Sequence, residues 1–563
     1  MQVSVRKDAL LLPGFMIAWF VINCLQASLT GVDGDEAYYW VLSRHLDWGY
    51  FDHPPFVTLL IRLGESIAHG PLFTRLGTII LSTLTIGIIY KALPDDLKNT
   101  KYLILIFAGT VVLNVYSFIA TPDAPLFFFA SLFFLGYKKY LEKENISSVL
   151  LIAFSIAGML YSKYHGILPV LFTIASNPKL LRRKSFWLIA LIVSLALLPH
   201  IAWQWKHDWP TLRYHLYERN ASDYKPEFTI NYILGQVLVW GPFTFILFLR
   251  NILRVKTSDK LIKAHLFTFY GIFLFFFISS FNNSVEPHWT LVSGISFVIL
   301  FDHIILHAKE KYRSVLKKVF YVNISFILVA RVLFAVPGSP FILIKNYKPF
   351  FEGKEWAGTV YEKAGNTAVI FVNSYILPSL YSFYYPQASV AGYNEKNYRK
   401  TQYSLTSHDC EMDGKPVLVF DTAISPDSNW HIKSGFCDGS LTPIPAFTCT
   451  NSLKIKPVNV PRQFAKGETI KIDLLVMNTG NTTIINRNNL SIDYAFFEEK
   501  YDFINSPISI PLMDGFFPAG SSKQIQIMLT APATKGRYNL LFSIVNPPFN
   551  GNFASQFYPV EIQ

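Results

Sequence analysis

The sequence predicts a polytopic α-helical membrane protein with about eleven spans, followed by an extracytoplasmic α/β module and a β-sandwich. Three observations support this fold class. Apolar runs close to the roughly 20 residues that cross a bilayer recur through the first 340 residues. Lys and Arg concentrate in alternate loops between these runs, as the positive-inside rule describes. After residue 350, Pro, Gly and Asn become frequent, and no later run is long enough to span.

The overall composition agrees with a membrane protein. The chain is 51% hydrophobic and contains 49 Phe residues, with a mean hydropathy of +0.30. Its formal net charge of +12 could indicate a nucleic-acid partner. Because the basic residues fall mainly between apolar runs, a membrane explanation fits better, and we expect membrane lipids rather than nucleic acid as partners.

The apolar runs and the basic loops together predict a topology. The distribution of Lys and Arg places the N-terminus in the cytoplasm and the C-terminal domains outside, as in a multi-pass protein of a bacterial inner membrane. We expect a transmembrane domain over residues 1–340, a periplasmic α/β module over 341–450 and an immunoglobulin-like sandwich over 451–563. The spans are expected near 9–29, 72–90, 101–119, 123–141, 147–163, 164–177, 185–203, 229–249, 264–281, 288–307 and 317–336.

The segments after the membrane domain have their own patterns. TAVIFVNS at 367–374 and PVLVFD at 416–421 indicate buried strands, and 354–363 indicates a helix. From about residue 450, period-two strands alternate with turn signals, which is typical of a β-sandwich. Outside the membrane, one disulfide among Cys410, Cys437 and Cys449 is plausible, and the sequence does not select the pair.

The loop from Gly31 to Leu63 is the strongest candidate for a functional site. Carboxylates beside a membrane segment are costly unless they bind something. The alternative is an ordinary polar loop with an aromatic belt. The loop concentrates five acids and two imidazoles around a Pro-Pro pair: Asp33, Asp35, Glu36, Asp47, Asp52, His45 and His53.

Four further loops on the same predicted face carry polar residues of the types that form sites. Asp123 begins the fourth span, where it suits either a helix N-cap or a ligand carboxylate. Lys163 follows the fifth span and either extends to the interface or neutralises a phosphate. The other candidates are His215 and Arg219 in the loop 204–228, and Glu286 and His288 before the tenth span.

Several nucleotide-dependent classes are disfavoured by missing motifs. The chain has no GxxxxGK[ST] loop, no GxGxxG after a strand and no CxxC pair. A nucleotide-driven transporter and a dinucleotide enzyme are therefore disfavoured. A carboxylate site that faces outward from a membrane suits a lipid-linked donor instead.

The motifs DGDEAYYW, GYFDHPP, TPDAP, SKYHG, YHLYER and EPHW occur in this order and resemble the membrane glycosyltransferases of the C-type superfamily. The similarity is to the bacterial branch of the protein O-mannosyltransferases, which includes lipid A aminoarabinose transferases and lipopolysaccharide galacturonic acid or galactosamine transferases. It covers roughly residues 1–340. It implies inverting transfer of a sugar from a polyprenyl-phosphate donor to lipid A, lipopolysaccharide core or another envelope acceptor on the outer face of the inner membrane.

The resemblance also implies roles for individual residues. Asp35, the Asp of the first-loop DE motif, corresponds to the residue at the reaction centre, and we expect Glu36 beside it to be catalytic as well. His53 stands where the aminoarabinose transferases have a lysine, so it would hold a phosphate only when protonated. The full set expected is Asp35 and Glu36 as catalytic residues, His53, Lys163, Arg219, Glu286 and His288 as substrate-binding residues, and Asp52, Asp123 and His215 as ligands of one divalent ion such as Zn²⁺.

Two alternatives remain open at this point. Salt bridges without an ion would explain the same polar residues as well as a metal site does. A lipid or solute transporter would also place charges within the membrane, although such proteins usually show repeated halves with paired broken helices. Protein O-glycosylation is a further possibility within the same fold.

Overall fold

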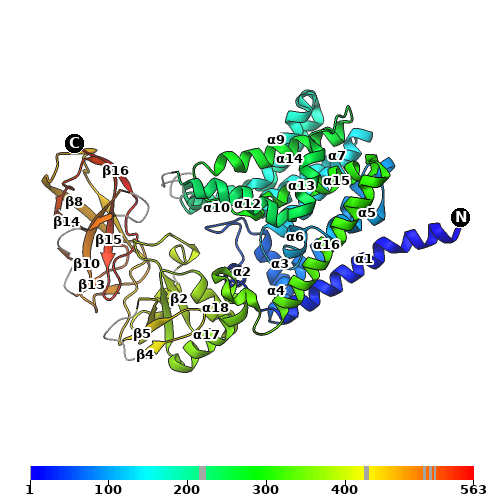
Figure 1. Ribbon diagram of the computed structural model, residues 1–563. Coiled ribbons are helices and arrows are strands. Elements are labelled where there is room, and N and C mark those ends of the chain that lie inside the picture. The colour runs from blue at the N-terminus through cyan, green and yellow to red at the C-terminus, as the bar shows by residue number, and fades with distance from the viewer. Residues whose placement is uncertain are drawn as a thin grey trace. The chain divides into compact units, whose positions relative to one another are not determined.

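The computed structural model describes residues 2–214, 224–406, 408–423, 430–498, 503–505, 510–512 and 515–563, with only the backbone described for residues 2–9. The chain divides into two compact units. The first comprises residues 1–213 and 223–351, and the second comprises 214–222 and 352–563. In Figure 1 the helices of the first unit run from blue to green, and the strands of the second run from yellow-green to red.

The first unit is entirely helical between its connecting loops. Its helices are α1 (Gln2–Leu29), α2 (Gly34–Ser43), α3 (Phe56–Glu65), α4 (Pro71–Ala92), α5 (Thr100–Ala108), α6 (Val111–Val115), α7 (Asp123–Glu142), α8 (Ile146–Ser162), α9 (Ile167–Ser176), α10 (Lys184–Lys206), α11 (Pro210–Arg213), α12 (Pro226–Trp240), α13 (Pro242–Ile252), α14 (Lys260–Ser279), α15 (Gly294–His307) and α16 (Glu310–Ala335). Short 3-10 turns lie between them, including η2 (Tyr164–Gly166) and η5 (Pro287–Ser293).

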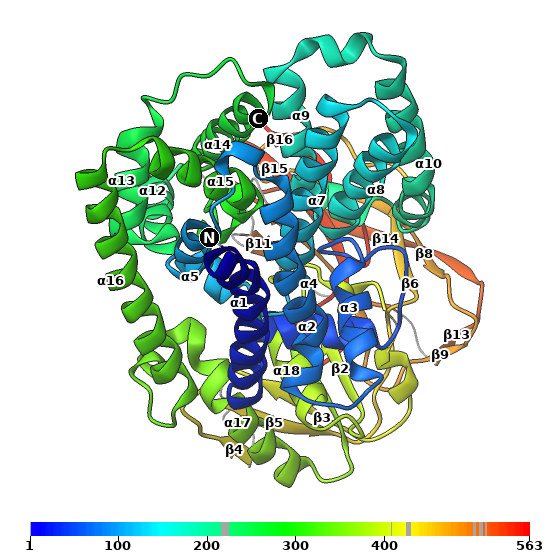
Figure 2. The same cartoon turned by 90° about the vertical axis from the view of Figure 1, so that its right-hand side faces the viewer.

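The predicted multi-pass membrane architecture is confirmed. Within the described residues, six helices are long and apolar enough to cross a bilayer: Leu10–Leu29, Pro71–Ala92, Lys184–Lys206, Lys260–Ser279, Pro287–His307 and Glu310–Ala335. The other predicted spans are shorter or broken helices, except for the 20-residue α7, which is not among these six. The count of eleven therefore stays a prediction. Buried aromatic and aliphatic residues from α1, α4, α7, α14 and α15 form the main core, and Figure 2 shows α1 running beside α4.

Two of the predicted spans are interrupted by glycines. The span expected near 229–249 divides into α12 and α13, which meet at 102°. Gly241 at the bend has φ +100°, and an added Cβ would lie 2.6 Å from Thr244 Oγ1, so only glycine suits this position. The span expected near 101–119 divides into α5 and α6 around Gly109. Asn323 of α16 links the two breaks, because its Nδ2 donates to Gly109 O and Thr244 Oγ1.

The second unit contains an α/β module and a β-sandwich. The module has α17 (Lys348–Ala364), which starts in the first unit, α18 (Ile376–Tyr384), and a sheet of order β2-β1-β3-β5-β4. The strands β1 (Ala368–Val372), β2 (Val390–Tyr393) and β3 (Val417–Asp421) are parallel to one another. The strands β4 (Trp430–Ile432) and β5 (Gly439–Ile444) pair antiparallel with each other, and β5 pairs antiparallel with β3.

The sandwich packs its sheets around a shared apolar core of alternate strand residues. One sheet has the order β11-β10-β15-β16-β7 with β12 on β10, a second has β14-β8-β6, and β13 pairs with β9. The strands are β6 (Leu453–Pro457), β7 (Gln463–Phe464), β8 (Thr469–Asn478), β9 (Ile484–Ile485), β10 (Ser491–Phe497), β11 (Phe503–Asn505), β12 (Ile510–Pro511), β13 (Phe516–Phe517), β14 (Ser522–Thr530), β15 (Gly536–Val545) and β16 (Tyr558–Ile562).

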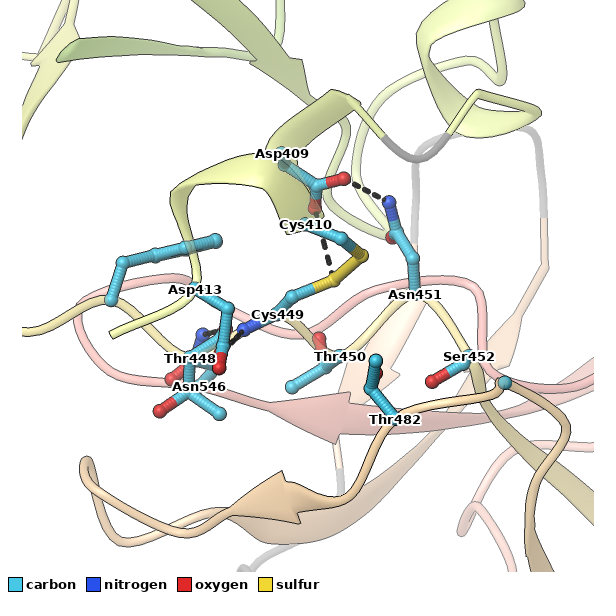
Figure 3. The surroundings of a disulfide bond; sticks show 12 residues. Asp409, Cys410, Asp413, Thr448, Cys449, Thr450, Asn451, Ser452, Thr482 and Asn546 are labelled. Carbon is cyan, nitrogen blue, oxygen red and sulfur yellow. Dashed lines mark hydrogen bonds between the residues drawn. A yellow bond between two sulfur atoms is a disulfide. The ribbon is translucent and has the colours of Figure 1, made fainter. Parts of the chain in front are cut away.

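A disulfide joins the module to the linker that precedes the sandwich (Figure 3). Cys410 is bonded to Cys449, which leaves Cys437 as a free thiol. The Cys449 amide donates to Asp413 Oδ1 at 2.9 Å, and Asn546 of the sandwich donates to the carbonyl of Thr448 at 2.8 Å. Residues of both domains therefore hold the linker in place.

Candidate active site

The start of α2 fixes the acidic loop. Asp33 is the N-cap of this helix, and its side chain accepts from the Asp35 amide at 3.4 Å. Glu36 completes a capping box, because its Oε2 accepts from the Asp33 amide at 3.0 Å. Carboxylates are also stabilised by the positive end of the helix dipole. The position of Asp35 therefore follows from a short, locally determined helix start.

Glu36 is fully buried and forms an ion pair with Arg75 of α4. Its Oε2 lies 2.6 Å from Arg75 Nη2, its Oε1 lies 2.8 Å from Nε, and Oε1 also accepts from the Ala120 amide at 2.7 Å. The remaining Arg75 donors bond to the end of α1, at Ala27 O, Thr30 O, Thr30 Oγ1 and Gly31 O. Because these contacts occupy both Glu36 oxygens, we assign Glu36 to positioning instead of the catalytic role expected for it.

Asp35 and Asp33 are the half-exposed carboxylates at this helix start. Burial and the charges of Asp35 and Glu36 raise the pKa of Asp33 to about 8. A raised pKa of Asp33 reduces the negative charge beside Asp35. Both carboxyls are half-exposed, and the catalytic role of Asp35 stays a prediction.

Asp123, at the first position of α7, is buried beside Lys163. The Lys163 ammonium lies 3.0 Å from both carboxylate oxygens, and His288 Nε2 lies 3.7 Å from Oδ2. No side-chain cap bond is formed at this helix start. Asp123 is therefore a buried ion-pair residue rather than a helix cap, and Lys163 is buried instead of extending to the membrane surface.

Tyr116 is the residue around which the predicted loops converge. Its ring stacks on His288 with centroids 4.9 Å apart. Its hydroxyl is within electrostatic reach of four carboxylates from three separate loops: Asp33, Asp35, Asp123 and Glu286. His53 acts electrostatically on Asp123, while Glu286 itself is exposed. The structure thus brings together the first loop, the turn before α7, the start of η2 and the turn before α15.

The rest of the first loop docks on α10. His200 Nδ1 lies 2.7 Å from Trp48 O, and Trp203 Nε1 donates to Asp47 at 2.8 Å. Asp52 accepts a 2.8 Å hydrogen bond from the Tyr38 hydroxyl, which ties the distal loop back to α2. These contacts hold the first loop in a fixed position against α10 and α2.

The expected metal ligands fit an ion poorly as far as the structure describes them. Both oxygens of Asp123 already face the Lys163 ammonium, which supplies the charge that an ion would supply. Asp52 is bonded to Tyr38. His215, and the expected phosphate ligand Arg219, lie outside the described residues. The divalent ion therefore stays a prediction, and no chemical step below is routed through it.

Arg75, Tyr38, Tyr116 and His200 were not anticipated from the sequence. Arg75 gave a usable signal, because a lone arginine within an apolar span normally has a specific partner. The aromatic residues and His200 gave none, since their contacts depend on tertiary packing between distant helices. The sequence therefore located the carboxylates better than the groups that support them.

Comparison with solved structures shows which fold the chain has. The chain has the fold of ArnT from Cupriavidus metallidurans. The apo structure aligns with a TM-score of 0.56 and 14% identity, over 78% of this chain and 98% of ArnT. The structure of ArnT bound to undecaprenyl phosphate aligns with a TM-score of 0.54 and 15% identity, over 76% of this chain and 97% of that chain.

Sequence comparisons then show which protein families the chain resembles. Residues 52–203 match the family described as dolichyl-phosphate-mannose-protein mannosyltransferase. Two Rhizobium johnstonii proteins are similar: a lipid A galacturonosyltransferase, 22% identical over 38% of this chain and 46% of its own length, and a lipopolysaccharide core galacturonosyltransferase, 28% identical over 36% and 44%. The chain thus spans less than half the length of these curated relatives. The predicted resemblance to membrane glycosyltransferases of the C-type superfamily is confirmed.

Proposed function

We propose that this protein transfers a sugar from a polyprenyl-phosphate donor to an envelope glycolipid, with inversion at the anomeric carbon. The observation that carries the proposal is the convergence of carboxylates from three loops around Tyr116, beside one buried lysine. The fold shared with ArnT, which has been solved with undecaprenyl phosphate, supports a lipid-phosphate donor. The galacturonosyltransferase relatives support lipid A or lipopolysaccharide core as acceptor.

Asp35 is the group that we assign to the reaction centre. In an inverting transfer, the acceptor hydroxyl oxygen attacks the anomeric carbon while the bond from that carbon to the phosphate oxygen breaks. The phosphate leaves with the bonding electron pair, and a carboxylate takes the acceptor proton. Asp35 suits this role because it is half-exposed at a fixed helix start, and because the raised pKa of Asp33 lowers the negative charge beside it.

The leaving phosphate needs positive charge, and Lys163 is the buried cation nearest to the converging carboxylates. In the structure described here its charge is balanced by Asp123. An arriving phosphate would compete with Asp123 for the ammonium, as charge-assisted hydrogen bonds to phosphate are strong. His53 and His288 would add to the binding when protonated, and Arg219 is a further candidate from the adjoining loop.

The acceptor class has one specific competitor. The matching family is described by transfer to protein, which favours protein hydroxyl groups as a second candidate acceptor. For either acceptor we propose that the reaction occurs on the outer face of a bacterial inner membrane, with the N-terminus in the cytoplasm. The Lys and Arg distribution among the loops supports this orientation.

A reconstituted transfer assay tests the proposal. Purified full-length protein in nanodiscs would be given undecaprenyl-phosphate-linked sugars, with lipid A and serine- or threonine-containing peptides as separate acceptors. We expect labelled lipid A with the wild type and loss of transfer with Asp35→Asn. The exposed loop carboxylate Asp47 gives the matched control, and Asp47→Asn should retain transfer. Wild-type transfer by Asp35→Asn would overturn the assignment, and labelled peptide alone would replace the acceptor.

A further inference from the structure

Arg331 of α16 is a cation within a membrane helix that has no carboxylate partner. Its Nη2 donates to Asn23 Oδ1 at 2.9 Å, to Asn114 O at 2.8 Å and to Ser117 Oγ at 3.3 Å. No salt bridge of Arg331 occurs among the residues that the structure describes. A charge at such a position is costly unless something compensates it.

Arg75 provides an internal comparison. The two guanidinium groups lie over the same ring, Phe118, at 5.6 Å for Arg75 and 5.5 Å for Arg331. Arg75 is neutralised by Glu36 and uses its donors on the end of α1. Arg331 has only neutral acceptors on its Nη2. The difference leaves one uncompensated positive charge in this part of the helical unit.

Three donor atoms of α1 and α16 are left without a hydrogen-bond partner within the described part of the chain. Arg331 Nη1, Asn23 Nδ2 and Gln26 Nε2 are each buried without a hydrogen-bond partner among the described residues. The amide orientation of Asn23 is fixed, because its oxygen accepts from both Ser117 and Arg331. Asn23 and Gln26 are three residues apart and therefore share one face of α1. An acceptor-only group, such as a phosphate, would satisfy such a set.

The surroundings of these residues favour a ligand that arrives from the lipid phase. α1 and α16 contact each other and are, with α10, the three least buried of the six described spans. Neighbouring residues such as Leu25 and Val332 are 58% and 63% exposed. Asn23 lies six residues before the end of α1 and Arg331 four before the end of α16, which is roughly 9 Å and 6 Å below those ends. That depth is within reach of lipid headgroups on the side of the acidic loop.

We propose that Arg331, Asn23 and Gln26, here called the Arg331 donor cluster, bind the phosphate of an anionic membrane lipid in the leaflet next to the acidic loop. The proposal is independent of the transfer reaction, because it rests on the unsatisfied donors and the missing counter-charge. Bound phosphate would neutralise Arg331 and fasten α1 to α16 at the point where α1 leads into α2. The lipid would then stabilise the end of the helical unit that positions Asp35.

Lipid-dependent stability tests the proposal with full-length protein in detergent. Dioleoyl phosphatidylglycerol and dioleoyl phosphatidylcholine would be added separately, and binding measured by native mass spectrometry together with the shift in melting temperature. We expect phosphatidylglycerol to bind and stabilise the wild type. Arg331→Gln should weaken this binding at least tenfold, since it removes charge-assisted hydrogen bonds. Lys318→Gln, which removes an exposed charge of the same helix, should bind as the wild type does.

Gln26→Leu keeps the test decisive if Arg331→Gln does not fold. This near-isosteric change removes an amide with an unsatisfied donor, so a purely structural cluster would be unaffected or stabilised by it. We expect it to weaken phosphatidylglycerol binding severalfold without lowering the melting temperature of the lipid-free protein. The proposal is overturned if the variants keep the wild-type phosphatidylglycerol shift, if both lipids stabilise equally, or if inorganic phosphate alone produces the whole effect.

Discussion

The two compact units bury charged groups in different ways. In the helical unit, Glu36 and Asp123 are each paired with a buried cation, and the partners are 39 and 40 residues apart in the chain. In the C-terminal unit, Lys396 and Asp493 form one buried pair. The buried carboxyl of Asp409 accepts instead from the Asn451 amide and from backbone amides, with the Lys454 charge acting on it electrostatically.

This difference distinguishes residues that hold the structure in place from residues that act in the proposed reaction. A buried ion pair is expensive to form and gives little net stability, so its presence needs another reason. In the helical unit that reason is the geometry around Asp35 and Tyr116. In the C-terminal unit, apolar sheets and a covalent link provide the order. We therefore expect charge changes to affect the first unit most, and covalent changes to affect the second.

Removal of the Glu36 charge should have the largest effect. Glu36→Gln leaves Arg75 buried without a counter-charge, which typically costs about 3–5 kcal/mol. We expect a large loss of thermal stability, measured by size-exclusion chromatography after heating in detergent. Asp35→Asn, one residue away and half-exposed, should melt as the wild type does. Equal melting of the two variants would contradict the division between a positioning and a reacting carboxylate.

Loss of the disulfide should destabilise the C-terminal unit alone. The bond closes a loop with a sequence separation of 39, and such a loop corresponds to about 4 kcal/mol in the chain-entropy description. In a Cys410→Ser, Cys449→Ser double variant we expect faster hydrogen exchange in the linker 447–452, with unchanged exchange in α2. Unchanged exchange in the linker would show that the side-chain hydrogen bonds to the linker keep it ordered without the disulfide.

The Lys163 charge should matter more for transfer than for folding. We expect Lys163→Met to lower the transfer rate about 100-fold, a typical cost for a lost electrostatic contact to developing charge. Because this variant also leaves Asp123 unpaired, its control is the double variant Lys163→Met, Asp123→Asn, which restores neutrality. The double variant should recover stability without recovering transfer. Recovered transfer would mean that Lys163 only balances Asp123.

The last prediction is a pH dependence in the C-terminal unit. Burial raises the pKa of Asp409 to about 7, so the folded chain holds a proton that the unfolded chain releases near pH 4. Stability should therefore fall as the pH rises from about 4 to 7, by at most about 1.4 kcal/mol per pH unit. Asp409→Asn should flatten this dependence in melting experiments monitored by hydrogen exchange of 408–413. A slope that survives this substitution would place the titrating group elsewhere.

Much of the fold could be predicted because hydrophobic pattern determines element type. Strands expected at 367–374 and 416–421 appear as β1 and β3, and the helix expected at 354–363 lies within α17. The two helix breaks were missed for different reasons. Gly241-Pro242 is a sequence signal for a break that the length of the apolar run outweighed. Gly109 carries no such signal, and its break is visible only in the structure, where Asn323 contacts both breaks.

The candidate site was predicted in part for a similar reason. Asp35, Asp123 and Lys163 are polar residues at the ends of apolar runs. A charge beside the membrane costs free energy, so such residues stand out as candidates for a functional role. Their pairing was not visible, because the spacing of Asp123 and Lys163 along the chain carries no information about the angle between α7 and α8. Glu36 was assigned to catalysis because it adjoins Asp35, whereas its side chain points to Arg75.

The bend at Gly241 bears on how the chain enters the membrane during synthesis. Two apolar arms that meet at 102° form either a single crossing with a break or a hairpin that leaves by the face it entered. The two arrangements differ by one in the number of membrane crossings, and therefore in whether that number is odd or even. Parity decides which compartment receives every later residue, including both folded domains after α16. A glycine whose φ few other residues adopt thus takes part in the topogenesis of the whole C-terminal half.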